Sequence, residues 1–148
     1  MSAEARSGVE WDSQVDVEAQ LRKATEAEPG NAANWMHLGR LLAQRQECAA
    51  EAEEAYRKAI ELDPKCADYW NDLGILLAET LGRTADAEAA YRKAIELHPR
   101  FAWFWNSLGD LLAKIPARTA EAEAAYRKAV ELPPKSGWFW NGLGVLLA

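Results

Sequence analysis

The sequence predicts an all-α protein built as a solenoid of stacked, antiparallel helix pairs. The main evidence is a nine-residue segment that begins with Trp, contains Leu-Gly and ends in Leu-Leu-Ala. It starts at Trp35, Trp70, Trp105 and Trp140, so the step is 70 − 35, 105 − 70 and 140 − 105, which is 35 residues each time. Self-similarity at such a period is typical of solenoids, in which each repeat buries its apolar face against the next.

A second recurring segment supports the same fold class. The pattern Ala-x3-Tyr-x2-Ala-x4-Pro predicts helices over about 49–62, 84–97 and 119–132, each placed between two Trp segments. Alanines and one aromatic ring on a shared face let two helices approach closely. Glycine inside a helix is unfavourable by about 1 kcal/mol relative to alanine, so its return in every Trp segment predicts a tight helix contact there. These glycines are Gly39, Gly74, Gly109 and Gly144.

Taken in order, the chain begins with a small, polar stretch over residues 1–8, for which we expect disorder. Residues 9–148 are expected to form a single array. It opens with a helix of the Tyr type over about 13–28, which Pro29-Gly30 ends. Three complete helix pairs follow, separated by proline turns, and a final helix of the Trp type runs to Ala148.

The composition argues against several classes of function. The 148 residues are 49% hydrophobic and 27% charged, as in a soluble globular domain. A net charge of -6 disfavours nucleic acid as a partner. No apolar run approaches the roughly 18 residues that a membrane span needs, and no secretory signal is visible, so we expect a cytoplasmic protein that does not bind membranes.

Catalytic and metal sites are not indicated either. Cys48 and Cys66 do not form a Cys-x-x-Cys pair, and two cysteines and two histidines spread over different repeats do not converge on a metal. His37 and His98 have no nucleophile or carboxylate at a telling spacing. We therefore expect no enzymatic activity, no metal and no cofactor.

The two segments together resemble the tetratricopeptide repeat. Trp-x2-Leu-Gly followed by Ala-x3-Tyr-x2-Ala-x4-Pro recurs in register from about Asp16 to Ala148, with repeats of 35 residues where that family usually has ~34. The resemblance implies a right-handed superhelix of helix-turn-helix units. It also implies a non-catalytic module that binds a peptide or protein on its concave surface, which the first helix of each pair lines.

Side chains that point away from the buried stripe of each Trp helix are the candidates for that surface. One asparagine per repeat could grip the backbone of an extended peptide, although asparagine is also a common consensus choice after the Trp. Extra aromatic residues suit interface anchors at Trp103 and Trp138, whereas Phe104 and Phe139 are expected to fill the seam between repeats. The predicted binding residues are Arg40, Asn71, Asp72, Trp103, Asn106, Asp110, Trp138 and Asn141, and Ile75, Glu79 and Lys114 project to the same side.

One specialisation within the family is disfavoured. Members that hold the carboxylate tail of heat-shock chaperones use Lys, Asn and Arg on successive first helices. At the corresponding places this chain has Met36 with Arg40, then Asp72, then Asn106 with Asp110. One suitable charge and two unsuitable ones argue against such a clamp.

Self-assembly is the alternative to a peptide-binding module. Terminal repeats normally carry a polar outer face, but the last helix, Gly-Trp-Phe-Trp-Asn-Gly-Leu-Gly-Val-Leu-Leu-Ala, is strongly apolar. It could join copies into a homo-oligomeric scaffold, or be the cut edge of a longer natural superhelix. The near-identical repeats also fit recent duplication or a designed consensus sequence. The residues predicted for self-association are Trp138, Trp140, Leu143, Leu146 and Leu147.

Overall fold

The computed structural model describes residues 3–133 and 144–146, with side chains from residue 13 onward. All regular structure within these ranges is helical, which confirms the predicted all-α class. The chain forms two compact units, Met1–Asp63 and Pro64–Ala148. The single array predicted over residues 9–148 stays a prediction, and each unit is described by itself.

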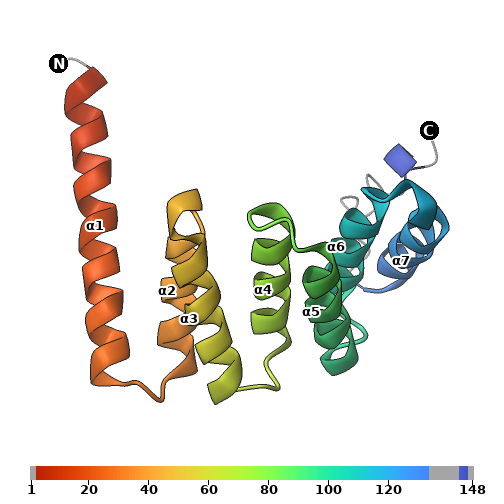
Figure 1. Cartoon of the computed structure of the whole chain (residues 1–148), viewed down its shortest axis with the longest axis horizontal. Coiled ribbons are helices and arrows are strands. Elements are labelled where there is room, and N and C mark those ends of the chain that lie inside the picture. Colours follow the sequence, from red (N-terminus) through yellow and green to blue (C-terminus); the bar gives the residue numbers. More distant parts are fainter. Residues whose placement is uncertain (1–2, 134–143, 147–148) are drawn as a thin grey trace. The chain divides into compact units, whose positions relative to one another are not determined.

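Unit 1 contains α1 (Ala3–Ala27), α2 (Ala32–Leu42), a short 3-10 helix η1 (Gln46–Cys48) and α3 (Ala49–Leu62). Helix α2 packs against α1 and, as an antiparallel hairpin, against α3 (Figure 1). Helix α1 begins at Ala3, whereas the pattern predicts an ordered chain only from Val9. Ala, Glu and Arg at the start of α1 are strong helix formers, so helix propensity extends beyond the amphipathic pattern on which the prediction relies.

Unit 2 contains two further hairpins, α4 (Ala67–Glu79) with α5 (Thr84–Leu97) and α6 (Ala102–Ala113) with α7 (Thr119–Glu131). A 3-10 helix η2 (Pro116–Arg118) makes the turn of the second hairpin. Helix α6 packs on both α5 and α4, so the second hairpin stacks directly on the first. The core consists of the alanine stripes of α5 and α7, the leucines of α4 and α6, and the fully buried Phe104.

The predicted close contact at the glycines is confirmed in three repeats. A Cβ built on Gly39, Gly74 or Gly109 would lie 2.8, 2.7 and 2.7 Å from a ring carbon of the tyrosine in the partner helix of the hairpin. These tyrosines are Tyr56, Tyr91 and Tyr126, all 3% exposed. At Gly144 the predicted close contact is absent among the residues that the structure describes, since none of them lies within 4 Å of the added Cβ. In the three confirmed repeats the tyrosine lies 56 − 39, or 17, residues after the glycine.

Each described Trp helix is anchored by a hydrogen bond that the sequence did not suggest. The indole N–H of Trp35 donates to the carbonyl of Pro29 at 3.0 Å, that of Trp70 to Pro64 at 3.0 Å, and that of Trp105 to Pro99 at 2.9 Å. Proline has no N–H to donate, but its carbonyl remains a strong acceptor. The residue that ends one helix pair thus holds the first turn of the next Trp helix.

Ion pairs join the Tyr helices of unit 2. Glu88 accepts hydrogen bonds from Arg92, as the i, i+4 spacing predicts, and from Arg118, 30 residues away at the start of α7. Arg118 also pairs with Glu121 at 2.6 Å. The hydrogen bond from Arg118 is the main reason that the pKa of Glu88 falls from 4.5 to about 2, while burial opposes this shift and Arg92 supports it.

This lowered pKa predicts a component of acid denaturation. A carboxyl group whose pKa is lower in the folded than in the unfolded chain stabilises the fold above its unfolded pKa, and that contribution is lost as the pH falls through the folded value. For Glu88 the window runs from 4.5 down to about 2. We expect Glu88→Gln to unfold at a lower temperature than the native chain at neutral pH, and the difference to shrink across this window.

Thermal unfolding followed by circular dichroism at a series of pH values measures the effect. Glu96→Gln is the matched control, since it removes an exposed carboxylate from the same helix, one that pairs with Lys93 at 2.9 Å. The control should keep the native pH dependence. If the unfolding temperatures of Glu88→Gln and the native chain differ by the same amount at every pH, Glu88 does not contribute to the pH dependence of stability.

Candidate functional site

The surface of unit 2 is hollowed between α4 and α6. The hollow has a volume of about 160 Å³. Residues of α4 form one wall and residues of α6 the other, with one tyrosine of α5 lining it as well. The lining residues are Ile75, Ala78, Glu79, Tyr91, Trp103, Ser107, Asp110 and Leu111.

Helical spacing explains why these side chains face the same way. On α6, Trp103, Ser107 and Asp110 stand at i, i+4 and i+7, which places them on one face, while Phe104 and Leu108 point into the core. On α4, Ile75 and Glu79 are four residues apart and share a face in the same way. Two apolar side chains remain open to solvent on these walls, Trp103 at 49% exposure and Ile75 at 38%.

Asp110 is held in place by two hydrogen bonds. The Asn106 amide Nδ2 donates to its Oδ2 at 3.0 Å, and the Tyr126 hydroxyl donates to its Oδ1 at 2.7 Å. Burial nevertheless raises the pKa of Asp110, against the lowering effect of these bonds and of Lys114. The two hydrogen bonds therefore fix the carboxylate in position, while Asp110 as a whole residue stays exposed to solvent.

Several carboxylates act on the tyrosine that lines the hollow. Burial raises the pKa of the Tyr91 phenol, and the charges of Glu79, Asp110 and Asp72 raise it further because they disfavour a phenolate. Lys114 of α6 balances part of this charge, since it pairs with Glu79 of α4 at 2.6 Å. Both side chains of that pair are more than half exposed, at 56% and 60%.

The structure brings together four of the residues predicted for binding, all in unit 2. Trp103 and Asp110 line the hollow, Asn106 supports Asp110, and the half-buried Asp72 acts on Tyr91 through its charge. Asn71 lies one turn before Ile75, but its side chain is 3% exposed and its Oδ1 has no hydrogen-bond partner among the described residues. It therefore does not offer its amide to solvent as the predicted ladder requires.

The remaining predicted residues lie elsewhere or outside the description. Arg40 is exposed on α2 of unit 1. Leu146 is half-buried beside Val145, which is 80% exposed. Residues outside the described part are Trp138, Phe139, Trp140, Asn141, Leu143 and Leu147.

Sequence reasoning missed the two tyrosines of the site. Tyr91 and Tyr126 belong by pattern to the core, which their 3% exposure confirms, but their hydroxyl ends reach the binding side. The available signal was the choice of tyrosine over phenylalanine, because a buried phenol usually needs a hydrogen-bond partner. The partner of Tyr126 is the carboxylate of Asp110, a residue that the sequence does single out.

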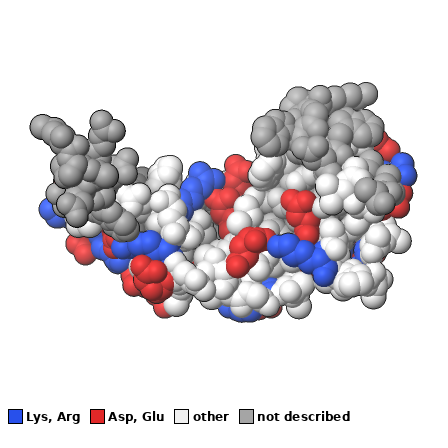
Figure 2. Space-filling model, turned by 90° about the horizontal axis from the view of Figure 1, so that it is seen from above, with Lys and Arg blue, Asp and Glu red and all other residues white. Residues whose placement is uncertain are grey.

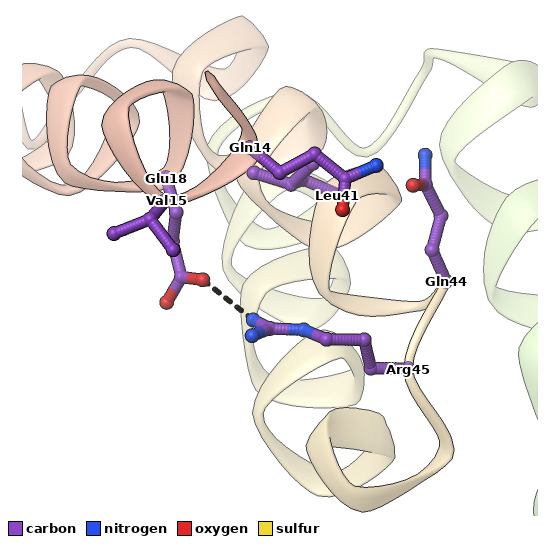
Figure 3. Close-up of a pocket in the computed structure, with 6 residues that line it drawn as sticks. All are labelled: Gln14, Val15, Glu18, Leu41, Gln44 and Arg45. Atoms are coloured by element: carbon purple, nitrogen blue, oxygen red, sulfur yellow. Dashed lines mark hydrogen bonds and ion pairs between the residues drawn. The ribbon is translucent and has the colours of Figure 1, made fainter. Parts of the chain in front are cut away.

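A smaller hollow in unit 1 lies beside ion pairs that join its helices. Figure 3 shows it between α1 and the end of α2, with Glu18 and Arg45 paired across it at 2.5 Å. Its volume of about 30 Å³ is roughly that of one water molecule in the liquid. Arg22 of α1 also pairs with Glu51 of α3 at 2.7 Å, so this region joins α1 to the hairpin.

A larger, apolar hollow of about 320 Å³ lies on α6 and α7. Its lining combines the exposed Arg92, Glu121, Ala124 and Lys128 with the repeat-core residues Ala125, Trp105, Leu108 and Leu112. The last two are 2% and 1% exposed. Because these are the positions through which one repeat packs, we assign this hollow to the packing seam and not to a ligand.

Acidic and basic side chains both lie on the face of the molecule that Figure 2 shows, where they are interleaved. Within the part of the chain that the structure describes, His, Cys, Asp and Glu side chains form no cluster of three or more that could hold a metal ion. No helix in those same residues is long and apolar enough to cross a membrane.

Comparison with known families gives one answer along most of the chain. A family model described as tetratricopeptide repeat matches residues 18–65, 45–100 and 76–137. A comparison with curated protein sequences finds no match.

Several solved structures share the fold. TTC0263, described as a thermophilic TPR protein in Thermus thermophilus, is 21% identical with a TM-score of 0.80, over 97% of this chain and 77% of its own. MamA is 20% identical with a TM-score of 0.78, over 99% and 83%. YrrB, described as a TPR protein with an unusual peptide-binding site, is 24% identical with a TM-score of 0.71, over 86% and 64%. At these identities the likeness establishes the fold alone.

Proposed function

Because the chain belongs to the tetratricopeptide repeat family, whose members are generally non-catalytic interaction modules, we propose that it binds an extended peptide or protein segment. The proposed contact surface is the hollow of unit 2 with its neighbours Trp103, Asn106 and Asp110. The observation that carries this proposal is the exposure of Trp103, which stands next to the fully buried Phe104 on the same helix.

An exposed tryptophan beside fixed polar groups is typical of a binding anchor. Tryptophan is enriched among the residues that contribute most to protein interfaces, because one rigid ring buries a large area. Here the ring borders a hollow in which Asp110 is already oriented by two hydrogen bonds. A partner would therefore meet a largely preorganised surface, which lowers the entropic penalty of binding.

Asn106 can contribute a contact to the partner backbone. Its amide uses one N–H for Asp110, which leaves a second N–H and the carbonyl oxygen for a peptide group. Such a contact does not depend on the sequence of the partner. The Trp103 ring and the hollow would then supply the selectivity.

A display experiment tests the proposal. Random peptides are selected on the intact chain, and the affinity of the enriched peptides is measured for Trp103→Ala, Asn106→Ala and the control Val17→Ala. We expect Trp103→Ala to weaken binding by about tenfold or more, as at interface anchors, and Asn106→Ala to weaken it less. Val17→Ala removes another apolar side chain, 45% exposed on α1, and should change nothing. Enriched peptides that bind Trp103→Ala as well as the native chain would reject this surface.

The other expectations stay predictions. They comprise contacts by Arg40, Asp72, Trp138 and Asn141, and a cytoplasmic location. A homo-oligomer joined through the C-terminal helix is the alternative to the peptide module. Light scattering of the native chain and of Trp140→Asp tests it, because a monomer at every concentration would remove self-assembly.

A further inference from the structure

The hollow beside Trp103 is the right size for one side chain. Small-molecule sites usually measure about 300–1,000 Å³, whereas this hollow has about 160 Å³. The hollow is also open to the surface between α4 and α6, and both helices carry further exposed residues outside it. A single side chain of a longer segment fits these dimensions better than a free small molecule does.

The walls of the hollow combine an aromatic ring with carboxylates. Trp103 stands on the α6 wall with Asp110, and Glu79 stands on the α4 wall. Tryptophan is the aromatic side chain that attracts a cation most strongly, through the negative face of its ring. An aliphatic stem could lie against Ile75, which is 38% exposed.

The charge around the hollow has one dominant sign. Glu79 and Asp110 line the hollow, Asp72 acts with them on the Tyr91 phenol, and Lys114 pairs with Glu79 at the rim. An acidic partner side chain would be repelled there. The Lys114 to Glu79 pair is solvent-exposed, and such pairs contribute little, so an incoming cation can replace or share it without a large penalty.

We propose that this hollow receives an arginine or lysine side chain of the bound segment, with its cation between Trp103 and the carboxylates of Glu79 and Asp110. The inference rests on the proposed function and specifies the chemistry of the partner. Asp110 is suited to this role because the Asn106 and Tyr126 hydrogen bonds hold its carboxylate in place before the cation arrives.

Three fluorescently labelled peptides of equal length test the inference against the intact chain. They contain four copies of Gly-Arg, of Gly-Gln or of Gly-Glu, and binding is measured by fluorescence anisotropy. We expect the arginine peptide to bind most tightly and its affinity to fall as salt is added. A Glu79→Gln/Asp110→Asn double variant should weaken that binding by about tenfold, the effect of two partly exposed ion pairs. The Asp110→Asn side chain retains an oxygen that can accept a hydrogen bond from the Tyr126 hydroxyl.

A matched control separates the site from the overall charge. Glu131→Gln, on the exposed end of α7, removes a carboxylate that does not line the hollow, and should leave binding of the arginine peptide unchanged. Equal losses in Glu131→Gln and in either single variant, Glu79→Gln or Asp110→Asn, would overturn the inference, because the attraction would then follow net charge alone.

The inference and the proposed function fail in different ways. If the glutamine or glutamate peptide binds as tightly as the arginine peptide, and Trp103→Ala abolishes that binding, the basic side chain is wrong and the binding surface stands. If none of the three peptides binds, the basic side chain is likewise rejected, and the display experiment decides on the surface. Arginine-selective binding that both Trp103→Ala and the double variant weaken supports the inference.

Discussion

Phe104→Ala is expected to lower the free energy of unfolding by about 3–5 kcal/mol, the usual range for a large aromatic side chain deleted from a core. The Phe104 ring is 1% exposed, and its centroid lies 4.8 Å from that of Phe101 in an edge-to-face arrangement. Removing it forfeits the burial of the ring and leaves a cavity where α6 packs in unit 2. Urea denaturation followed by far-ultraviolet circular dichroism measures the loss.

The neighbouring residue supplies the control for this prediction. Trp103→Ala removes a larger ring from the adjacent position, but that ring is 49% exposed, so we expect a loss of under about 1 kcal/mol. The two variants therefore separate stability from binding: Phe104→Ala should destabilise the fold, and Trp103→Ala should weaken the partner. Equal destabilisation by both would contradict the assignment of Trp103 to the surface.

Gly74→Ala should destabilise unit 2 by about 1–3 kcal/mol, the typical effect of overpacking a core. In an ordinary helix this change would stabilise by about 1 kcal/mol, since alanine is the better helix former. Here the new Cβ would lie 2.7 Å from Cε1 of Tyr91, a buried ring that cannot move aside like the end of a flexible chain. The steric clash should outweigh the gain in helix propensity.

Gly144→Ala is the matched control, because it makes the same substitution at the same place in the repeat. Within the described part of the chain no atom lies within 4 Å of a Cβ there, so we expect no loss of stability. Thermal unfolding of both variants beside the native chain measures the contrast. A stabilised Gly74→Ala would mean that Tyr91 and α5 can retreat, and that the glycine is not required by packing.

Much of the fold was predictable because the main packing contacts of each repeat join residues that are close together in the sequence. The Gly and Tyr of one hairpin lie 17 residues apart, as 91 − 74 shows, and both recur in three repeats, so their contact could be expected from spacing. Phe104 and Trp103 were also separated correctly into core and surface, since adjacent residues on a helix point in different directions.

What the repeat pattern could not predict is how equivalent residues differ. Asn71 and Asn106 occupy the same place in the repeat, yet Asn71 is 3% exposed while Asn106 is half-buried and donates to Asp110. The residue four positions later explains part of this difference, because it is Ile75 in one repeat and Asp110 in the other. Exposure depends on packing against other helices, which a single repeat does not encode.

Contacts to backbone atoms escape the sequence for another reason. The Trp indole donates to a proline carbonyl. Because every residue carries a backbone carbonyl, the residue type does not identify the acceptor. The hydrogen bond from Arg118 to Glu88 joins side chains that are 30 residues apart. The 35-residue period identifies equivalent positions in successive repeats, so it does not indicate contacts at this separation.

The indole-to-proline bond also bears on how such a chain can change in length. In the three described Trp helices its donor and acceptor lie six residues apart within one continuous stretch, so the turn before each of these helices is closed by residues that are inherited together. A repeat-length segment whose ends lie outside that stretch therefore contains both the donor and the acceptor of its own turn. Insertion or deletion of whole repeats therefore preserves these turns. The outward-facing side chains of each repeat can meanwhile diverge toward a different binding partner.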